Sequence, residues 1–152
     1  MKEIHHHVQE IKLSYSPAKF SGTTQKIQCS KDAVNVLLPF YNHDTMACQE
    51  EFLLLLLNKS HTPLGVIPIS KGGVSSTVVD IKLIMSIALK SLASSIILSH
   101  NHPSGNLEAS TEDIKLTEKI KNACDLMDIK LLDHIIMSPV HEYASFADLG
   151  KI

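Results

Sequence analysis

The feature that most constrains the fold of this chain is an uninterrupted apolar run, Phe52–Leu57, in a sequence of 152 residues. The run is far shorter than the roughly 20 residues needed to cross a membrane, and it suits a strand buried inside a protein. A turn over 58–63 separates it from a second extended segment over 64–70. Hydrophobic residues make up 44% of the chain and charged residues 20%, as in ordinary globular proteins.

Extended and helical segments alternate along the rest of the chain. Ser30 is placed to cap the first helix, and apolar residues recur at helical spacing in the two later ones. The predicted strands are 7–15, 52–57, 64–70, 95–99, 129–137 and 143–146, and the predicted helices are 31–40, 78–92 and one from Ser110 to 127. Such alternation predicts an α/β fold.

The length fits a single domain. We expect an N-terminal strand or extension over 1–29 and a folded unit over 30–152, effectively one domain. The sequence opens without an apolar leader, so we expect no secretory signal and a cytoplasmic protein without membrane segments. Cys29, Cys48 and Cys124 lack the spacing of a zinc finger or a disulfide framework, and are predicted to be reduced and at least half-buried.

The charges disfavour a nucleic-acid-binding surface. The formal net charge is -2, and all 14 basic residues are lysines. The commonest specific base contact, a bidentate arginine on guanine, is therefore not available. The lysines form no basic block, although single lysines can still bind phosphate. Direct nucleic-acid binding is disfavoured by this composition without being excluded.

Metal-ligating residue types gather after the strand predicted at 95–99. His100 and His102 are two apart, so that in extended backbone they project to the same side. Pro103 should end the strand. Ser110 then stands at a helix N-cap position, and Asp113 falls in the first helical turn. Two histidines and one aspartate could converge on one ion, which zinc would bind at about 2.0–2.2 Å.

A simpler interpretation of the same residues stays open at this point. Ser-x-x-Asp is close to a capping box, so Ser110 and Asp113 would then only start a helix. Of the other histidines, His43, His61 and His141 are predicted to lie in loops or on the surface. The run from His5 to His7 resembles a polar start or a tag remnant, and it would chelate added metal.

The stretch from His100 to Asp113 matches H-x-H-x7-S-x2-D, the motif of the JAMM (MPN-plus) zinc metallopeptidases, at all four positions. It is most similar to the RadC-like branch of that family. That branch is marked by His-Asn-His-Pro-Ser-Gly, here 100–105, Leu-Asp-His-Ile-Ile, here 132–136, and Tyr-x-Ser-Phe-Ala, here 143–147. The resemblance covers roughly 30–150. It implies a mixed, curved sheet sandwiched by helices, with MPN-like and cytidine-deaminase-like layering.

The resemblance implies a zinc-dependent hydrolase of the deubiquitinase type, acting on a peptide or isopeptide bond. By that analogy His100, His102 and Asp113 ligate Zn²⁺, and a water of lowered pKa fills the fourth position. Ser110 helps to stabilise the oxyanion. A glutamate upstream accepts the proton of the water and returns it to the leaving amine.

In the family this glutamate precedes a strand with the pattern Glu-x-Phe-apolar. The segment 50–53 fits that pattern, with Glu50 as the general base. Adjacent strand residues point to opposite faces, so only one of the two neighbouring glutamates can reach the ion. We favour Glu50, and we expect Glu51 to be a solvated charge at the strand entrance.

Other functions remain open beside the peptidase. The RadC label indicates a DNA-repair or recombination accessory, or a zinc nuclease, although the residues before the resemblance are too few for the helix-hairpin-helix region of full-length members. A non-catalytic MPN-like scaffold is a third possibility. Asp133 and His134 belong to the branch signature without a derived role; His134 is either a partner of a metal ligand or an ordinary strand histidine. The expected partner is a protein or peptide substrate, and the oligomeric state is open, with a dimer possible.

Overall fold

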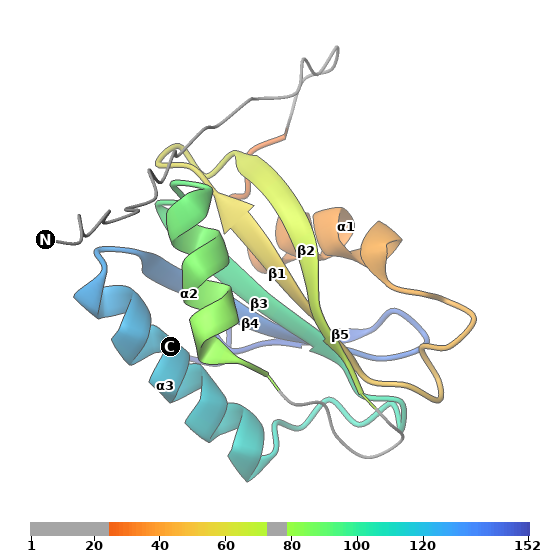
Figure 1. The fold of residues 1–152 in the computed structure, drawn as a ribbon. Coiled ribbons are helices and arrows are strands. Elements are labelled where there is room, and N and C mark those ends of the chain that lie inside the picture. Colours follow the sequence, from red (N-terminus) through yellow and green to blue (C-terminus); the bar gives the residue numbers. More distant parts are fainter. Residues whose placement is uncertain (1–24, 73–78) are drawn as a thin grey trace, which may run out of the picture.

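A computed structural model of the chain describes residues 25–72 and 79–152, which form a five-stranded sheet flanked by helices (Figure 1). The strands are β1 Glu51–Leu57, β2 Pro63–Lys71, β3 Ser95–Asn101, β4 Lys130–Met137 and β5 Tyr143–Ser145. The helices are α1 Ser30–Leu37, the 3-10 helix η1 Leu38–Phe40, α2 Ile81–Lys90 and α3 Thr111–Leu126. The strand order is β2-β1-β3-β4-β5; β3 and β4 are parallel and the other neighbours antiparallel.

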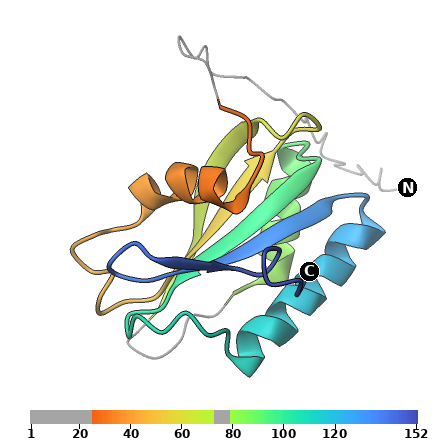
Figure 2. The same ribbon diagram turned by 180° about the vertical axis from the view of Figure 1, so that it is seen from behind.

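The helices cover both faces of the sheet, with α2 and α3 on one side and α1 on the other (Figures 1 and 2). The apolar run of β1 explains this layering. Leu54 and Leu56 pack in the cluster that contains residues of α2 and α3, whereas Leu53 and Leu55 pack with residues of α1. All seven residues of β1 are buried. The predicted α/β fold, with a mixed sheet between helices, is confirmed.

The central strand β3 carries the chain to the candidate site. All of its residues are buried, and α3 connects it to the parallel strand β4. Parallel neighbours require such a crossover, which places the end of β3 near the start of the helix. The strand predicted over 95–99 continues to Asn101, since His100 pairs with Phe52 of β1. Pro103 follows the end of β3, as expected.

The first helix begins differently from the prediction. Cys29 is the N-cap residue, and Ser30 is the first helical residue. The Ser30 hydroxyl donates instead to Asp148 Oδ2 at 2.6 Å. The prediction of Ser30 as the cap was wrong by one residue, because the helix starts at Ser30 itself and its hydroxyl bonds to a distant partner instead of the helix end. The helix tightens to the 3-10 form at Pro39, which has no N–H to donate to the preceding turn.

The second helix starts later than predicted. Its N-cap is Asp80, whose side chain accepts a hydrogen bond from the Lys82 N–H at 2.8 Å. The predicted start at Val78 lies outside the described residues, as do the strand predicted over 7–15 and the histidines of 5–7. Within the described part of the chain, no helix has both the length and the apolar character that a membrane crossing requires.

The cysteines differ in exposure, and all three are free thiols. Cys29 and Cys48 are exposed, so the prediction that they are at least half-buried was wrong. Cys29 directly precedes α1, and Cys48 lies in the loop before β1. Neither segment has an apolar periodicity from which the exposure of the thiol could be predicted. Cys124 is buried between α3 and α2, where its Sγ lies 3.9 Å from the sulfur of Met85.

Cys124 is expected to resist alkylation in the native protein. Burial, helped by the nearby charge of Asp125, raises the pKa of its thiol to about 11, so little reactive thiolate is present at pH 8. A time course with iodoacetamide, followed by peptide mass spectrometry, should show Cys124 reacting at least about tenfold more slowly than Cys29 and Cys48. In 8 M urea the difference should vanish. Equal rates in the native protein would contradict the burial of Cys124.

Candidate metal-binding site

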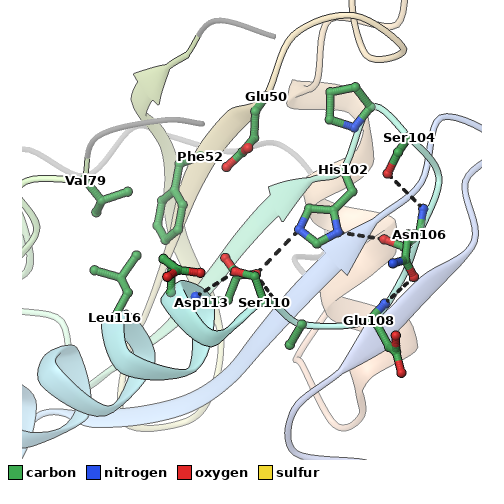
Figure 3. Close-up of a pocket in the computed structure, with 13 residues that line it drawn as sticks. Glu50, Phe52, Val79, His102, Ser104, Asn106, Glu108, Ser110, Asp113 and Leu116 are labelled. Atoms are coloured by element: carbon green, nitrogen blue, oxygen red, sulfur yellow. Dashed lines mark hydrogen bonds and ion pairs between the residues drawn. The ribbon is translucent and has the colours of Figure 1, made fainter. Parts of the chain in front are cut away.

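Three side chains converge where β3 ends and α3 begins. His100 Nε2 lies 2.9 Å from His102 Nε2 and 3.2 Å from Asp113 Oδ1. His102 Nε2 lies 3.6 Å from Asp113 Oδ2. One possible ligand atom from each residue falls within 4.8 Å of the other two, so together they could hold a metal ion. The predicted convergence of these three residues is observed, and Figure 3 shows His102 and Asp113 facing one another across the site.

The helix start holds the aspartate in place. Ser110 is the N-cap of α3, and its Oγ accepts a hydrogen bond from the Asp113 N–H at 3.1 Å. Asp113 Oδ2 in turn accepts from the Ser110 N–H at 2.7 Å, which completes a capping box. The simpler interpretation of Ser-x-x-Asp as a helix start is therefore also correct. The same carboxylate caps the helix with Oδ2 and presents Oδ1 to His100.

The turn after β3 fixes the orientation of the His102 ring. His102 Nδ1 lies 2.6 Å from the Asn106 carbonyl, which can only accept a hydrogen bond. The proton of the neutral imidazole is therefore on Nδ1, and the lone pair of Nε2 faces the cluster. Gly105 has a φ of +79°, a conformation that favours glycine and that lets the turn bring Asn106 back to the ring.

The electrostatics of the cluster favour a positive charge among its three groups. Burial opposes the ionisation of Asp113, yet hydrogen bonds with His100 and His102 outweigh it and hold the pKa of this carboxyl well below its usual range. The hydrogen bond to Asp113 raises the pKa of His102 against the opposing effect of burial. The neutral imidazoles and the carboxylate would otherwise turn lone pairs toward one another. A proton or a metal ion placed among them removes that repulsion.

Glu50 lies beside this cluster, immediately before β1. It lines a cleft of about 800 Å³ together with Phe52, His102 and Asp113. Its carboxylate is directed into the cleft from the side opposite α3 (Figure 3). Burial raises the pKa of Glu50, although the charges of the two histidines partly oppose the shift. A carboxylate with a raised pKa, near a set of metal ligands, can accept and return a proton.

Glu51 is turned away from the cleft. It is buried, its Oε2 accepts a hydrogen bond from the Asn42 N–H at 3.1 Å, and its Oε1 pairs with Lys71 Nζ at 2.9 Å. The expectation of a solvated charge at the strand entrance was wrong, because the loop before β1 folds over the carboxylate. Of the two neighbouring glutamates, the structure brings only Glu50 to the cleft.

Asn101 holds the backbone on both sides of Glu50. Its Oδ1 accepts from the Glu51 N–H at 2.7 Å, and its Nδ2 donates to the Gln49 and Met46 carbonyls at 2.8 Å each. The side chain is fully buried. Sequence reasoning missed this residue, although an amide between two histidines in a buried strand is a signal, because its polar atoms require partners.

Two other signature residues have different roles. Asp133 joins β4 to the segment after β5: it accepts hydrogen bonds from the Ser145 hydroxyl at 2.6 Å and the Ala147 N–H at 3.0 Å. His134 Nε2 lies 2.8 Å from His100 Nδ1, so His134 is a hydrogen-bond partner of one of the residues that could bind a metal. His43, His61 and His141 are exposed and lie outside the helices and strands, as predicted.

Comparisons with known proteins identify the family of this chain. The model of the RadC-like JAB domain matches residues 27–151. The chain belongs to the RadC-like JAB domain family. It is 40% identical to a UPF0758 protein of Flavobacterium johnsoniae over 126 residues, which cover 83% of this chain and 53% of that protein. It is 41% identical to a UPF0758 protein of Porphyromonas gingivalis over 136 residues, or 90% of this chain and 59% of that protein.

The membership confirms the resemblance drawn from the motif. A UPF0758 protein of Shewanella baltica is also similar, at 38% identity over 103 residues, 68% of this chain and 45% of that protein. This RadC-like JAB domain spans about half the length of the curated relatives it matches. The family supports a relation to the JAMM superfamily, and the cluster of His100, His102 and Asp113 gives the domain a set of residues that could bind a metal.

Replacing Asn101 by alanine is expected to destabilise the domain. The change leaves one N–H and two carbonyls without partners beside Glu50, each of which costs about 1–3 kcal/mol when buried. We expect urea unfolding to show a loss of about 3 kcal/mol. Asn42→Ala is the matched control: its exposed side chain accepts from the Asp44 N–H alone among residues 25–72 and 79–152, and the loss should be about 1 kcal/mol or less. Equal losses would contradict the role of Asn101.

Proposed function

We propose that the protein is a zinc-dependent hydrolase of peptide or isopeptide bonds, with His100, His102 and Asp113 as zinc ligands and Glu50 as the general base. The observation that carries this proposal is the spacing of the three donors. Ligand atoms at about 2.0–2.1 Å from a tetrahedral zinc lie about 3.3 Å from one another. The two Nε2 atoms lie 2.9 Å apart, His100 Nε2 lies 3.2 Å from Asp113 Oδ1 and His102 Nε2 lies 3.6 Å from Asp113 Oδ2, so each separation is within about 0.5 Å of that value.

The number and type of donors also support a catalytic zinc site. Structural zinc sites use four protein ligands, whereas catalytic ones use three, commonly imidazole and carboxylate. Here two of the three metal-ligating side chains, those of His102 and Asp113, line an open cleft, while His100 is buried in β3. The cleft, at about 800 Å³, falls within the usual range of ligand sites.

The residues divide the chemistry between them. Zinc supplies Lewis acidity, which lowers the pKa of water and polarises an amide carbonyl. The carboxylate of Glu50 takes the proton from the attacking water and returns it to the leaving nitrogen. Ser110 is proposed to stabilise the oxyanion; its hydroxyl donates to Asp113 Oδ2 at 2.6 Å, so this role requires the hydroxyl to rotate toward the substrate.

The charge of the cleft favours an amide over a phosphodiester. Four carboxylates line it, from Glu50, Glu108, Glu112 and Asp113, and no lysine lines it among residues 25–72 and 79–152. A polyanionic backbone would be repelled there, whereas a peptide carries no backbone charge. A protein or peptide is therefore the proposed substrate, ahead of DNA. The complete donor set with Glu50 also favours an enzyme over a non-catalytic scaffold.

Zinc content is the first test. The protein lacking residues 1–7, which removes the three adjacent histidines, is expected to bind about one zinc per chain. His102→Ala should abolish this binding because it removes one of three ligands. Glu50→Gln should retain zinc and lower hydrolysis of a mixed peptide library about 100-fold or more, as measured by mass spectrometry.

Two outcomes of that test would contradict the proposal. One is a truncated protein that binds no zinc. The other is Glu50→Gln cleavage at the wild-type rate, which would remove Glu50 from the mechanism. Glu51→Gln would not serve as a control, since Glu51 pairs with Lys71 inside the fold. Glu112→Gln is the better match, because this exposed carboxylate lines the same cleft.

The nuclease alternative is tested directly. Zinc-loaded protein, incubated with single-stranded and duplex DNA, is expected to leave both intact, because the carboxylates of the cleft repel phosphate. Cleavage is followed on denaturing gels, with a chelator-treated sample as the control. Cleavage that a chelator abolishes, and that Glu50→Gln also lacks, would instead favour a zinc nuclease.

A further inference from the structure

His134 is buried in the sheet with both ring nitrogens in contact with polar atoms. It has no exposed surface, and its ring packs against Phe52 and Phe146 with centroids 5.6 and 4.9 Å away. Its Nε2 lies 2.8 Å from His100 Nδ1, and its Nδ1 lies 2.6 Å from Thr117 Oγ1. His134 therefore connects a proposed zinc ligand on β3 to a buried threonine on α3.

The Thr117 hydroxyl sets the direction of these hydrogen bonds. Thr117 Oγ1 lies 2.6 Å from the Asp113 carbonyl, one helical turn earlier. A carbonyl can only accept, so the single hydroxyl proton of Thr117 is donated there. Thr117 Oγ1 is then left as an acceptor for the Nδ1–H of His134.

The proton on His134 Nδ1 also determines which ring donates in the contact between His134 and His100. The His134 ring has no exposed surface and packs between Phe52 and Phe146, where a charge would be costly to bury, so the ring is neutral and carries one proton. With that proton on Nδ1, its Nε2 is an acceptor, and the contact at 2.8 Å must be donated by His100 Nδ1–H. The Nε2 of neutral His100 is then unprotonated, and this is the atom that faces His102 and Asp113.

We propose that Thr117 and His134 are positioning residues, which hold the proton of His100 on Nδ1 and so present its Nε2 lone pair to the metal. This inference rests on the proposed function only in assuming that a metal binds at His100. The hydrogen bonds run from the Asp113 carbonyl to Thr117, His134 and His100, whose ring lies beside the Asp113 carboxylate. These four residues form a closed circuit that links α3, β4 and β3.

The direction of these hydrogen bonds matters because the opposite direction would put a proton on the His100 nitrogen that faces the proposed metal. Without the Thr117 oxygen, the His134 proton can move to Nε2, which faces His100 Nδ1. His100 would then accept at Nδ1 and carry its own proton on Nε2. A protonated ring nitrogen cannot ligate a metal, and hydrogen bonds that orient metal-bound histidines commonly contribute 10–100-fold to metal affinity.

Thr117→Val and Thr117→Ser form the matched test. Valine keeps the shape and removes the oxygen, whereas serine keeps the hydroxyl. In competition with a chromophoric chelator, Thr117→Val should bind zinc about 10–100-fold more weakly than wild type, and Thr117→Ser within about threefold of wild type. Equal affinity of the valine and wild-type proteins, or no rescue by serine, would overturn the proposal.

Nitrogen NMR of the zinc-free protein tests the proton positions without any metal. The long-range proton–nitrogen pattern should show His100 and His134 protonated on Nδ1 in wild type, and His100 at least partly protonated on Nε2 in Thr117→Val. A wild-type His100 protonated on Nε2 would overturn the proposal. If wild type shows the expected protons but binds no zinc, the proposed function fails while the circuit itself is confirmed.

Two further variants separate positioning from folding. Ser99→Ala, in the same buried strand, removes the hydrogen bond of 2.7 Å to Tyr41, which lies on the face of the sheet opposite the His100 ring. It should lower stability without changing zinc affinity or the proton on His100. His134→Phe keeps a ring among Phe52 and Phe146 but offers His100 no acceptor, so its zinc affinity should fall as in Thr117→Val. Wild-type affinity in His134→Phe would overturn the proposal.

Discussion

Two imidazoles and a carboxylate meet at the end of β3, and a positive charge placed among them lowers the repulsion between their lone pairs. The Nε2 atoms of His100 and His102 lie 2.9 Å apart, and they lie 3.2 and 3.6 Å from oxygens of the Asp113 carboxylate. His100 is almost wholly buried, so bulk water does not screen its ring. The rest of the fold holds these groups together. Because the fold holds the three groups close together, a cation bound among them would stabilise the folded protein.

Successive side chains of β3 point to opposite faces of the sheet, so the neighbouring residues His100 and Asn101 have different roles. His100 follows the parity of Leu98 and stacks on Phe52, on the face covered by α2 and α3. Asn101, one residue later, faces the other side and holds the loop before β1. Because successive residues of a strand point to opposite faces, two neighbouring residues position both the proposed ligand set and the proposed base. A shift of register by one residue would exchange the two.

Local pattern and family motif predicted most of the fold and the candidate ligands. The apolar run of β1, the start of α3 and the positions of His100, His102 and Asp113 all depend on short stretches of sequence. The failures involve partners that are distant along the chain. Ser30 hydrogen-bonds to Asp148, and Glu51 pairs with Lys71, so neither residue behaves as its own neighbourhood indicates. Thr117 was not singled out, because only the fold brings β4 against its hydroxyl.

The helix cap and the ligand set, which the sequence alone presents as alternatives, depend on one carboxylate. A capping box usually has glutamate or glutamine at its third position, whereas this helix has Asp113. With one methylene fewer, the carboxylate stays close to the helix end, so that Oδ2 accepts from the Ser110 N–H while Oδ1 faces His100. Capping thus restricts the side chain to the orientation in which it completes the cluster. The backbone carbonyl of Asp113 accepts from the Thr117 hydroxyl. Asp113 therefore fixes the orientation of its own carboxylate and, through Thr117 and His134, the position of the proton on His100.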